Sequence, residues 1–219
     1  MRASLDSRSR AIMLASIAAA LAFYVLRMPE PMAVWLIALK GAGVALLAVL
    51  AWIAGSGREG RLLAAIMALG ALGDVLIELS LVAGAAAFLV GHLVAIALYL
   101  RNRRPSLSPS QKLLALAILL AVPAIGWSLP ADRTMAPLVL LYAVALAAMA
   151  AAAWTSRFSR YSVGIGAVLF VLSDLLIFAR GGPLAQSMLP HLLIWPLYYA
   201  GQLLICLGVL SRAGRRSAG

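Results

Sequence analysis

Residues 32–54 read MAVWLIALKGAGVALLAVLAWIA, a run of 23 residues in which Lys40 is the one charged side chain. A helix that spans a membrane needs about 20 predominantly apolar residues, so this run is long enough to cross a bilayer. Seven more apolar runs of similar length occur, each bounded by charged residues or by Pro and Gly. The eight predicted spans are residues 11–27, 32–54, 61–80, 84–101, 112–129, 134–154, 161–180 and 189–211.

The composition agrees with a membrane protein and excludes a water-soluble globule. Of the 219 residues, 64% are hydrophobic and 11% are charged, and the mean hydropathy is +1.02. Soluble domains average about 45–50% apolar and about 25% charged residues. Eight helices of about 21 residues use about 168 positions, which leaves no room for a separate soluble domain. We therefore predict one all-α integral membrane domain over residues 1–219, a polytopic bundle of eight transmembrane helices.

The positive charge is distributed as the positive-inside rule requires. The chain carries 18 Lys and Arg against 7 Asp and Glu, a net charge of +11. A nucleic-acid surface would gather these cations on one face together with stacking aromatics, but here they separate the apolar runs. With eight spans, 14 cations fall on the side of both termini, and Arg27, Arg133 and Arg180 fall on the other. This asymmetry predicts cytoplasmic termini in a bacterial inner (cytoplasmic) membrane.

Two stretches one hundred positions apart resemble each other. Gly73-Asp74-Val75-Leu76-Ile77 lies in the third predicted span, and Ser173-Asp174-Leu175-Leu176-Ile177 lies in the seventh. Some membrane folds are built from repeats of this kind. The similarity suggests a possible four-plus-four internal repeat with both halves in the same orientation.

Ionisable residues inside the spans are the candidates for function. A charge at the bilayer centre costs about 2.5–3.5 kcal/mol, so retained charges usually face the bundle interior or a wet cavity. Asp74 and Asp174 lie about six residues, roughly 9 Å, from the outer ends of their spans, and Lys40 and His92 lie about eight residues, roughly 12 Å, from theirs. We expect these four groups to converge on one layer of a cavity that opens outward.

Each candidate also has a structural reading. Lys40 could be a counter-ion for Asp74 or Asp174, or it could bind an anionic head group. His92 taken alone is more often a hydrogen-bonded interhelical residue than a catalyst, and Glu78 shares a helix face with Asp74 and could be only a polar residue at the cavity mouth.

The remaining polar and aromatic residues of the spans have ordinary explanations. Tyr198, Tyr199 and Gln202 could be interhelical hydrogen bonders. Tryptophans near the predicted membrane boundaries are typical of aromatic belts. The five tryptophans are Trp35, Trp127 and Trp195 at the outer boundary and Trp52 and Trp154 at the inner one.

Several chemistries leave no trace in the sequence. The phosphate loop Gly-x-x-x-x-Gly-Lys-Ser/Thr, His-Glu-x-x-His pairs, Cys-x-x-Cys pairs and the nucleophile elbow Gly-x-Ser-x-Gly are all absent. Two histidines cannot assemble a three-histidine zinc site. The single cysteine, Cys206, excludes an intramolecular disulfide. No cofactor and no metal are expected.

The order and spacing of several short motifs resemble those of the YhhN-like family of membrane proteins, whose characterised members are lysoplasmalogenases. The resemblance covers the second to the eighth predicted span. The motifs are Leu39-Lys40, Leu69-Gly70-Ala71-Leu72-Gly73-Asp74-Val75-Leu76, Phe88-Leu89-Val90-Gly91-His92, Gly166-Ala167-Val168-Leu169-Phe170-Val171-Leu172-Ser173-Asp174 and Tyr198-Tyr199-Ala200-Gly201-Gln202-Leu203-Leu204-Ile205.

This resemblance implies an activity. Family members hydrolyse the vinyl ether bond of lysoplasmalogen and release a fatty aldehyde and glycerophosphoethanolamine or glycerophosphocholine. The implied catalytic residues are Asp74 and Asp174. The implied substrate-binding residues are Lys40, Glu78, His92, Ser173, Tyr199 and Gln202. The implied partners are a lysophospholipid and the lipid bilayer, with no nucleic acid, and the oligomeric state stays open with a monomer favoured.

Two carboxyl groups suit this chemistry. Hydrolysis of a vinyl ether begins with protonation of the alkene carbon remote from oxygen and passes through an oxocarbenium ion, as in glycosidases that use one carboxylic acid and one carboxylate. Two other interpretations remain. A small transporter or lipid flippase would use the buried carboxylates as proton relays, and a structural subunit would use the polar residues only to hold its helices together.

Overall fold

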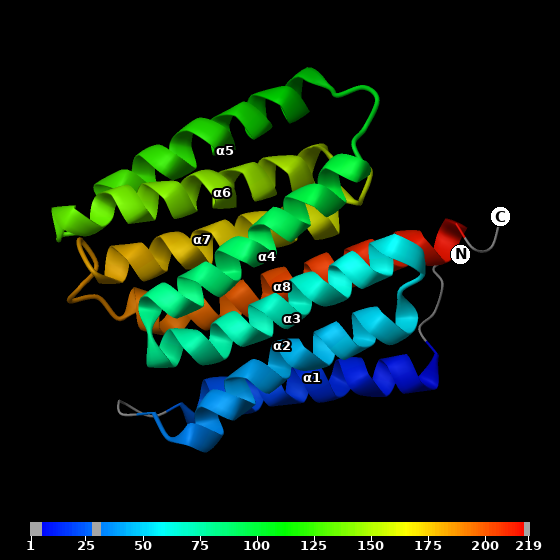
Figure 1. Cartoon of the computed structure of the whole chain (residues 1–219), viewed down its shortest axis with the longest axis horizontal. Coiled ribbons are helices and arrows are strands. Elements are labelled where there is room, and N and C mark those ends of the chain that lie inside the picture. Colours follow the sequence, from blue (N-terminus) through cyan, green and yellow to red (C-terminus); the bar gives the residue numbers. More distant parts are fainter. Residues whose placement is uncertain (1–5, 28–31, 217–219) are drawn as a thin grey trace. The chain divides into compact units, whose positions relative to one another are not determined.

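The computed structural model of the chain describes residues 6–27 and 32–216 (Figure 1). These residues form eight α-helices, each long and apolar enough to cross a membrane. The helices are α1 (Ser7–Leu26), α2 (Val34–Ala54), α3 (Gly57–Leu79), α4 (Leu81–Arg101), α5 (Pro109–Ser128), α6 (Ala136–Thr155), α7 (Ile165–Arg180) and α8 (Leu189–Arg216). The prediction of an all-α chain with eight helices of membrane-spanning length is confirmed.

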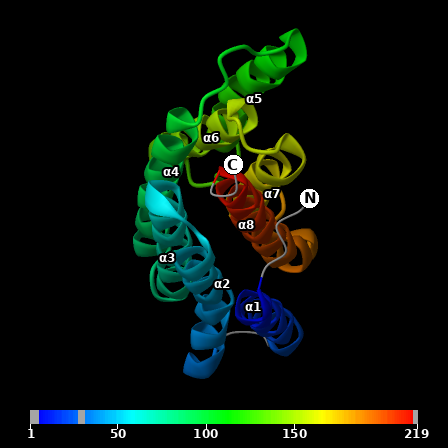
Figure 2. The same cartoon turned by 90° about the vertical axis from the view of Figure 1, so that its right-hand side faces the viewer.

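The chain divides into two compact units. Unit 1 comprises Met1–Leu98 and Cys206–Gly219, and unit 2 comprises Tyr99–Ile205. In unit 1, α1 packs against α2 and α2 packs against α3, as Figure 2 also shows. In unit 2, α6 packs against both α5 and α7. The last residues of α4 belong to unit 2, and the second half of α8 belongs to unit 1.

The helices begin where side chains satisfy their first backbone N–H groups. Asp6 accepts a hydrogen bond from the N–H of Ser9 at 2.7 Å. Ser108 and Gln111 form a reciprocal capping box ahead of α5, with Pro109 in the first turn. Such caps replace bonds that the first turn of a helix cannot make internally, and they explain why α5 starts three residues before the predicted boundary at 112.

The turn between α3 and α4 lies at Ser80, so the predicted start of the fourth span at residue 84 is three residues too late. The Ser80 hydroxyl accepts a hydrogen bond from the N–H of Ala83 at 3.3 Å, so α4 already begins at Leu81. Gly84 has a packing role instead, because a Cβ at this position would lie 2.6 Å from Cα of Ile77 on α3. The glycine marks a close helix approach inside α4 and not the start of the span.

The other connections are short and locally bonded. A turn of π-helix, Arg160–Gly164, precedes α7. A 3₁₀ turn, Arg133–Met135, precedes α6 and is capped by Asp132. Hydrogen bonds from the hydroxyl and the backbone N–H of Thr134 hold the pKa of Asp132 below its usual range.

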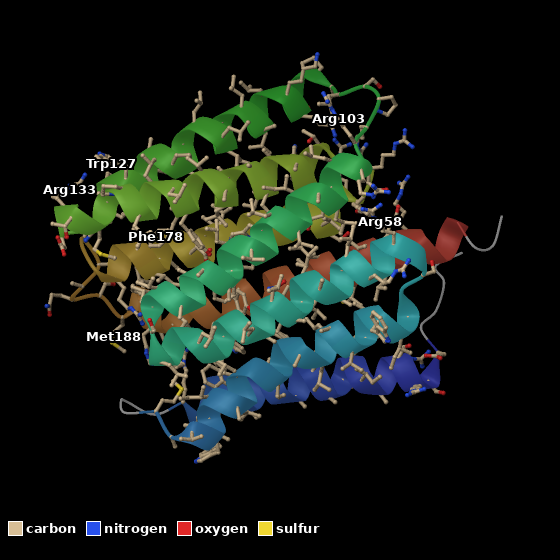
Figure 3. The ribbon with its side chains drawn as sticks, in the orientation of Figure 1. Arg58, Arg103, Trp127, Arg133, Phe178 and Met188 are labelled. Atoms are coloured by element: carbon tan, nitrogen blue, oxygen red, sulfur yellow. The ribbon has the colours of Figure 1, made fainter. Side chains whose placement is uncertain are left out.

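The tryptophans separate into exposed and buried groups. Trp35, Trp52 and Trp127 are exposed, as belt residues that contact lipid should be. In Figure 3 Arg133 lies beside Trp127, and its guanidinium carbon is 5.2 Å from the indole centroid. Trp195 is only 4% exposed, so the assignment of this residue to the belt is wrong. Its sequence position indicates depth along the helix but not the face on which the side chain lies.

Helices α7 and α8 approach closely at a pair of glycines. A Cβ on Gly166 would lie 2.7 Å from the carbonyl oxygen of Gly201, and a Cβ on Gly201 would lie 2.7 Å from that of Gly166. Lipid tails are as apolar as leucine, so helices in membranes associate through such close packing rather than through hydrophobic burial. This contact sets the distance between the two helices that carry most of the polar residues of unit 2.

We expect Gly201→Ala to lower the free energy of unfolding by about 1–3 kcal/mol, since the new methyl group overpacks the α7–α8 contact. The measurement is denaturation of the purified protein by SDS in mixed micelles. Gly91→Ala is the matched control, because its new methyl group would meet Cβ of Leu69 at an ordinary 3.5 Å. Equal destabilisation by both changes would contradict the assigned role of Gly201.

Candidate functional site

The predicted site residues in unit 1 lie on three helices: Lys40 on α2, Asp74 and Glu78 on α3, and His92 on α4. The nitrogen Nζ of Lys40 forms an ion pair with Oε1 of Glu78. The two side chains are only 13% and 21% exposed, so most of the pair is shielded from solvent. Lys40 Nζ also lies 6.0 Å from the centre of the Phe23 ring on α1.

The ion pair crosses the contact between α2 and α3. A Cβ on Gly41 would lie 2.7 Å from Cγ2 of Val75, so the backbone of α2 at Lys40 is nearly level with Asp74. The lysine side chain then extends toward Glu78, one turn further along α3. Asp74 itself is buried. Of the four predicted site residues in unit 1, the structure thus brings Lys40, Asp74 and Glu78 to one stretch of α3.

His92 lies deeper than the predicted single layer. The antiparallel register of α3 and α4 pairs Gly84 with Ile77, Phe88 with Gly73 and Gly91 with Leu69. His92 is therefore level with about Leu69, five residues or roughly 7.5 Å along α3 from Asp74. The difference arises because α4 begins at Leu81 rather than at residue 84, which moves His92 further from the α3–α4 turn.

In unit 2, Asp174 on α7 is bonded to a tyrosine of α6. The hydroxyl of Tyr142 donates to Oδ2 of Asp174 at 2.7 Å, and both side chains are buried. The Tyr142 ring also meets the ring of Phe178 edge to face, with centroids 5.6 Å apart. This bond between two buried side chains fixes the orientation of the carboxyl group.

Ser173 and the aromatic residues of α8 complete the polar part of unit 2. The Ser173 hydroxyl donates to the carbonyl oxygen of Ile194 at 3.0 Å. Gln202 Nε2 donates to the hydroxyl of Tyr198 at 3.3 Å. The Tyr199 ring stacks on the ring of Trp195 with centroids 6.0 Å apart. We call these side chains together with Tyr142 and Asp174 the unit 2 cluster.

Three members of the unit 2 cluster, Tyr142, Trp195 and Tyr198, were not among the predicted site residues. Tyr142 is a polar residue within an apolar span, which is a detectable signal, but its pairing with Asp174 depends on how α6 packs against α7. Trp195 lies one turn before Tyr198 and Tyr199, so its helical spacing shows that the three residues share one side of α8. In the sequence, neither Tyr142 nor Trp195 stands at a spacing from the aspartates that would predict a shared site.

These side chains can transfer protons and form hydrogen bonds. Within residues 6–27 and 32–216, no group of three or more His, Cys, Asp and Glu side chains is placed to hold a metal ion. The buried carboxyl groups, the phenols and the Lys40–Glu78 pair could exchange protons, orient water and bind an anionic group. Together the fold and these residues define an integral membrane protein with buried carboxyl groups on two of its spans.

Comparison with known proteins places the chain in a family. The model of the YhhN family matches residues 35–209, and the chain belongs to this family, as the motifs indicate. The chain is 34% identical to the lysoplasmalogenase TMEM86B of Sus scrofa over 202 residues, covering 85% of the chain and 81% of the relative. It is also 34% identical to the lysoplasmalogenase TMEM86B of Homo sapiens over 196 residues, covering 86% and 81%. No solved structure matches the chain.

The energetic role of the Lys40–Glu78 pair can be measured by a double-mutant cycle. We expect Lys40→Met to lower the free energy of unfolding by about 1–3 kcal/mol, between the values for exposed and fully buried pairs, because Glu78 loses its counter-ion. The double change Lys40→Met with Glu78→Leu should recover most of that loss. If the double variant is as unstable as the sum of the single variants, the two side chains do not interact energetically.

Proposed function

We propose that the chain is a lysoplasmalogenase-like membrane hydrolase, which cleaves the vinyl ether bond of a lysoplasmalogen. The observation that carries the proposal is the 34% identity, over 85% of the chain, to a relative named as a lysoplasmalogenase. The buried carboxyl groups supply the acid–base chemistry that this cleavage needs. The products are a fatty aldehyde and glycerophosphoethanolamine or glycerophosphocholine.

The reaction requires one proton donor and one water molecule. A proton adds to the alkene carbon remote from the ether oxygen, and the adjacent carbon and oxygen share the resulting positive charge. Water adds to that carbon and loses a proton, which restores the proton balance. The hemiacetal then breaks its carbon–oxygen bond to the glycerol, giving the aldehyde and the free hydroxyl. A carboxylic acid and a carboxylate serve a similar oxocarbenium-like transition state in glycosidases.

We assign the proton transfers to Asp74 and Asp174, with one carboxyl group donating the proton and the other stabilising the cation or activating the water. Burial supports this assignment, because both side chains are at most 5% exposed and a buried carboxyl group is a common general acid. Tyr142 is a positioning residue, since its hydroxyl bonds to Oδ2 of Asp174.

The other site residues are proposed to bind the polar part of the substrate. Lys40 is cationic and its ion pair with Glu78 is partly exposed, which suits exchange of Glu78 for a phosphate group. We propose that His92, Ser173, Tyr199 and Gln202 orient water or bind the glycerol hydroxyl and the phosphate. Their side chains lie within the membrane-spanning helices, where hydrogen-bonding groups are costly unless they are used.

We also propose that the protein is a monomer in a bacterial inner membrane with both termini in the cytoplasm. The concentration of 14 of the 18 Lys and Arg residues on one side of the predicted topology supports this orientation. No nucleic acid, metal or cofactor is part of the proposal.

The direct test is release of aldehyde from lysoplasmenylethanolamine by the purified protein in detergent. We expect turnover by the wild type and a loss of at least about 100-fold in Asp74→Asn and in Asp174→Asn, the range expected for removal of acid–base catalysis. Circular dichroism and size-exclusion chromatography check that each variant is folded. The saturated-ether lysolipid is the negative control substrate.

Two outcomes would contradict parts of the proposal. If both Asn variants keep wild-type turnover, the carboxyl mechanism is wrong. If the folded wild type releases no aldehyde, the hydrolase proposal fails, and a proton-flux assay in liposomes then tests transport.

Tyr142→Phe tests the positioning of Asp174. We expect kcat to fall by up to roughly tenfold with little change in KM, because a hydrogen bond is worth about 0.5–1.5 kcal/mol. Tyr161→Phe is the matched control, since Tyr161 is 73% exposed in the same unit and should keep wild-type kinetics. A change in KM alone for Tyr142→Phe would show that the hydroxyl binds substrate instead of orienting the carboxyl group.

A further inference from the structure

The α4–α5 and α6–α7 loops of unit 2, residues 102–108 and 156–159, are joined by arginine hydrogen bonds. Arg104 donates from Nε to the carbonyl oxygen of Ser156 at 2.6 Å and from NH2 to that of Phe158 at 3.2 Å. In the opposite direction, the N–H of Arg157 donates to the carbonyl oxygen of Asn102 at 2.6 Å and its Nε to that of Arg103 at 3.0 Å. We call these two segments the paired loops; their mutual bonds make them one ordered surface.

The paired loops carry a concentration of positive charge without carboxylates. The cations on them and on the adjoining helix ends are Arg101, Arg103, Arg104, Arg157, Arg160 and Lys112. Unit 2 contains two carboxylates, Asp132 and Asp174. Asp132 precedes Arg133, and Figure 3 shows Arg133 and Arg103 at opposite ends of the helices of unit 2. Asp174 is 14 residues beyond Arg160, roughly 21 Å along the helix.

Three buried hydrogen-bond donors lie at the same end of unit 2. Tyr99 Oη, Gln111 Nε2 and Trp154 Nε1 have almost no solvent exposure and no hydrogen-bond partner among the described residues. All three lie within three residues of the ends of α4, α5 and α6 at the paired loops. The Tyr99 ring contacts the ring of Phe158, with centroids 6.2 Å apart, which connects this layer to the loops. Unsatisfied buried donors are rare because each costs free energy.

We propose that the paired loops form a site for the phosphate of an anionic phospholipid head group. Arginine guanidinium groups match phosphate oxygens in charge and geometry, and the side chains of Arg101 and Arg103 are exposed at this surface. Phosphate oxygens accept hydrogen bonds, and the three buried donors lack an acceptor. The site is separate from the proposed catalytic residues and does not rest on the proposed function.

A membrane lipid fits this place better than a free phosphate ion. Helix α5 starts at the paired loops and presents a stripe of exposed leucines with helical spacing, Leu113, Leu116 and Leu120. A phospholipid with its phosphate at the loops can lay its acyl chains along this stripe. The start of α5 adjoins exposed residues of the paired loops, and lipid head groups lie at this boundary between membrane and water.

The test uses the full chain, delipidated in a neutral detergent, with phosphatidylglycerol as the probe and native mass spectrometry as the readout. We expect the wild type to retain phosphatidylglycerol and to bind phosphatidylcholine much more weakly. Arg101→Gln with Arg103→Gln should weaken phosphatidylglycerol binding roughly tenfold or more, since each cation near a membrane surface contributes appreciably to anionic lipid binding. The bond that joins Arg103 to the other loop uses its carbonyl group, so replacing its side chain keeps that bond.

Two further variants separate a site from general attraction. Arg58→Gln with Arg61→Gln removes two exposed cations from the start of α3 and gives the same net charge, so its binding should stay within twofold of the wild type. Tyr99→Phe removes one buried hydroxyl. If no ligand bonds to that hydroxyl, its removal leaves lipid binding unchanged and stability equal or higher; with a bound phosphate, we expect severalfold weaker binding of phosphatidylglycerol.

The outcomes decide the proposal. Equal loss in the two double variants, equal binding of phosphatidylglycerol and phosphatidylcholine, or unchanged binding by Tyr99→Phe would overturn it. Competition by inorganic phosphate at concentrations that leave phosphatidylcholine binding unchanged would support a phosphate site but assign it to the free ion rather than to a lipid.

Discussion

The hydrocarbon core of a bilayer supplies no water, so every backbone N–H and C=O group within it must be bonded inside the protein. This constraint makes each of the eight spans a continuous helix and confines irregular backbone to their ends. It also explains why the connections are so heavily bonded. Ser80 caps the turn between α3 and α4, and Arg104 donates to two loop carbonyl groups, because carbonyl and amide groups near the membrane boundary still need partners.

The same constraint acts on polar side chains. Helices in lipid gain little from hydrophobic contact, so they depend on close backbone approach and on bonds between polar groups. Gly166 and Gly201 provide the close approach in unit 2, and Tyr142 bonds to Asp174 there. In unit 1, Gly41 provides it and Lys40 pairs with Glu78. In unit 1 the Lys40–Glu78 pair lies beside the glycine contact, whereas in unit 2 Asp174 lies eight residues, roughly 12 Å, along α7 from Gly166.

Composition and hydropathy were sufficient to predict the number and class of the helices, because the length of an apolar run determines the thickness of bilayer that its helix can cross. They also identified Asp74, Asp174 and Lys40 as buried or nearly buried. They could not predict partners. The pairing of Lys40 with Glu78 and of Tyr142 with Asp174 depends on which helices are neighbours and on their register, and hydropathy carries neither. The depth of His92 was missed for a local reason. The fourth span was predicted to begin at Gly84, but this glycine lies inside α4 and packs against α3.

The two aspartates have similar sequence surroundings and different structural ones. Asp74 shares α3 with the ion pair of Glu78 and Lys40, whereas Asp174 accepts a hydrogen bond from a phenol within an aromatic group. A reaction that needs one carboxylic acid and one carboxylate is favoured by unlike environments, because they separate the proton affinities of the two groups. The Lys40–Glu78 pair on one side and the Tyr142 phenol on the other give the two carboxyl groups such unlike environments.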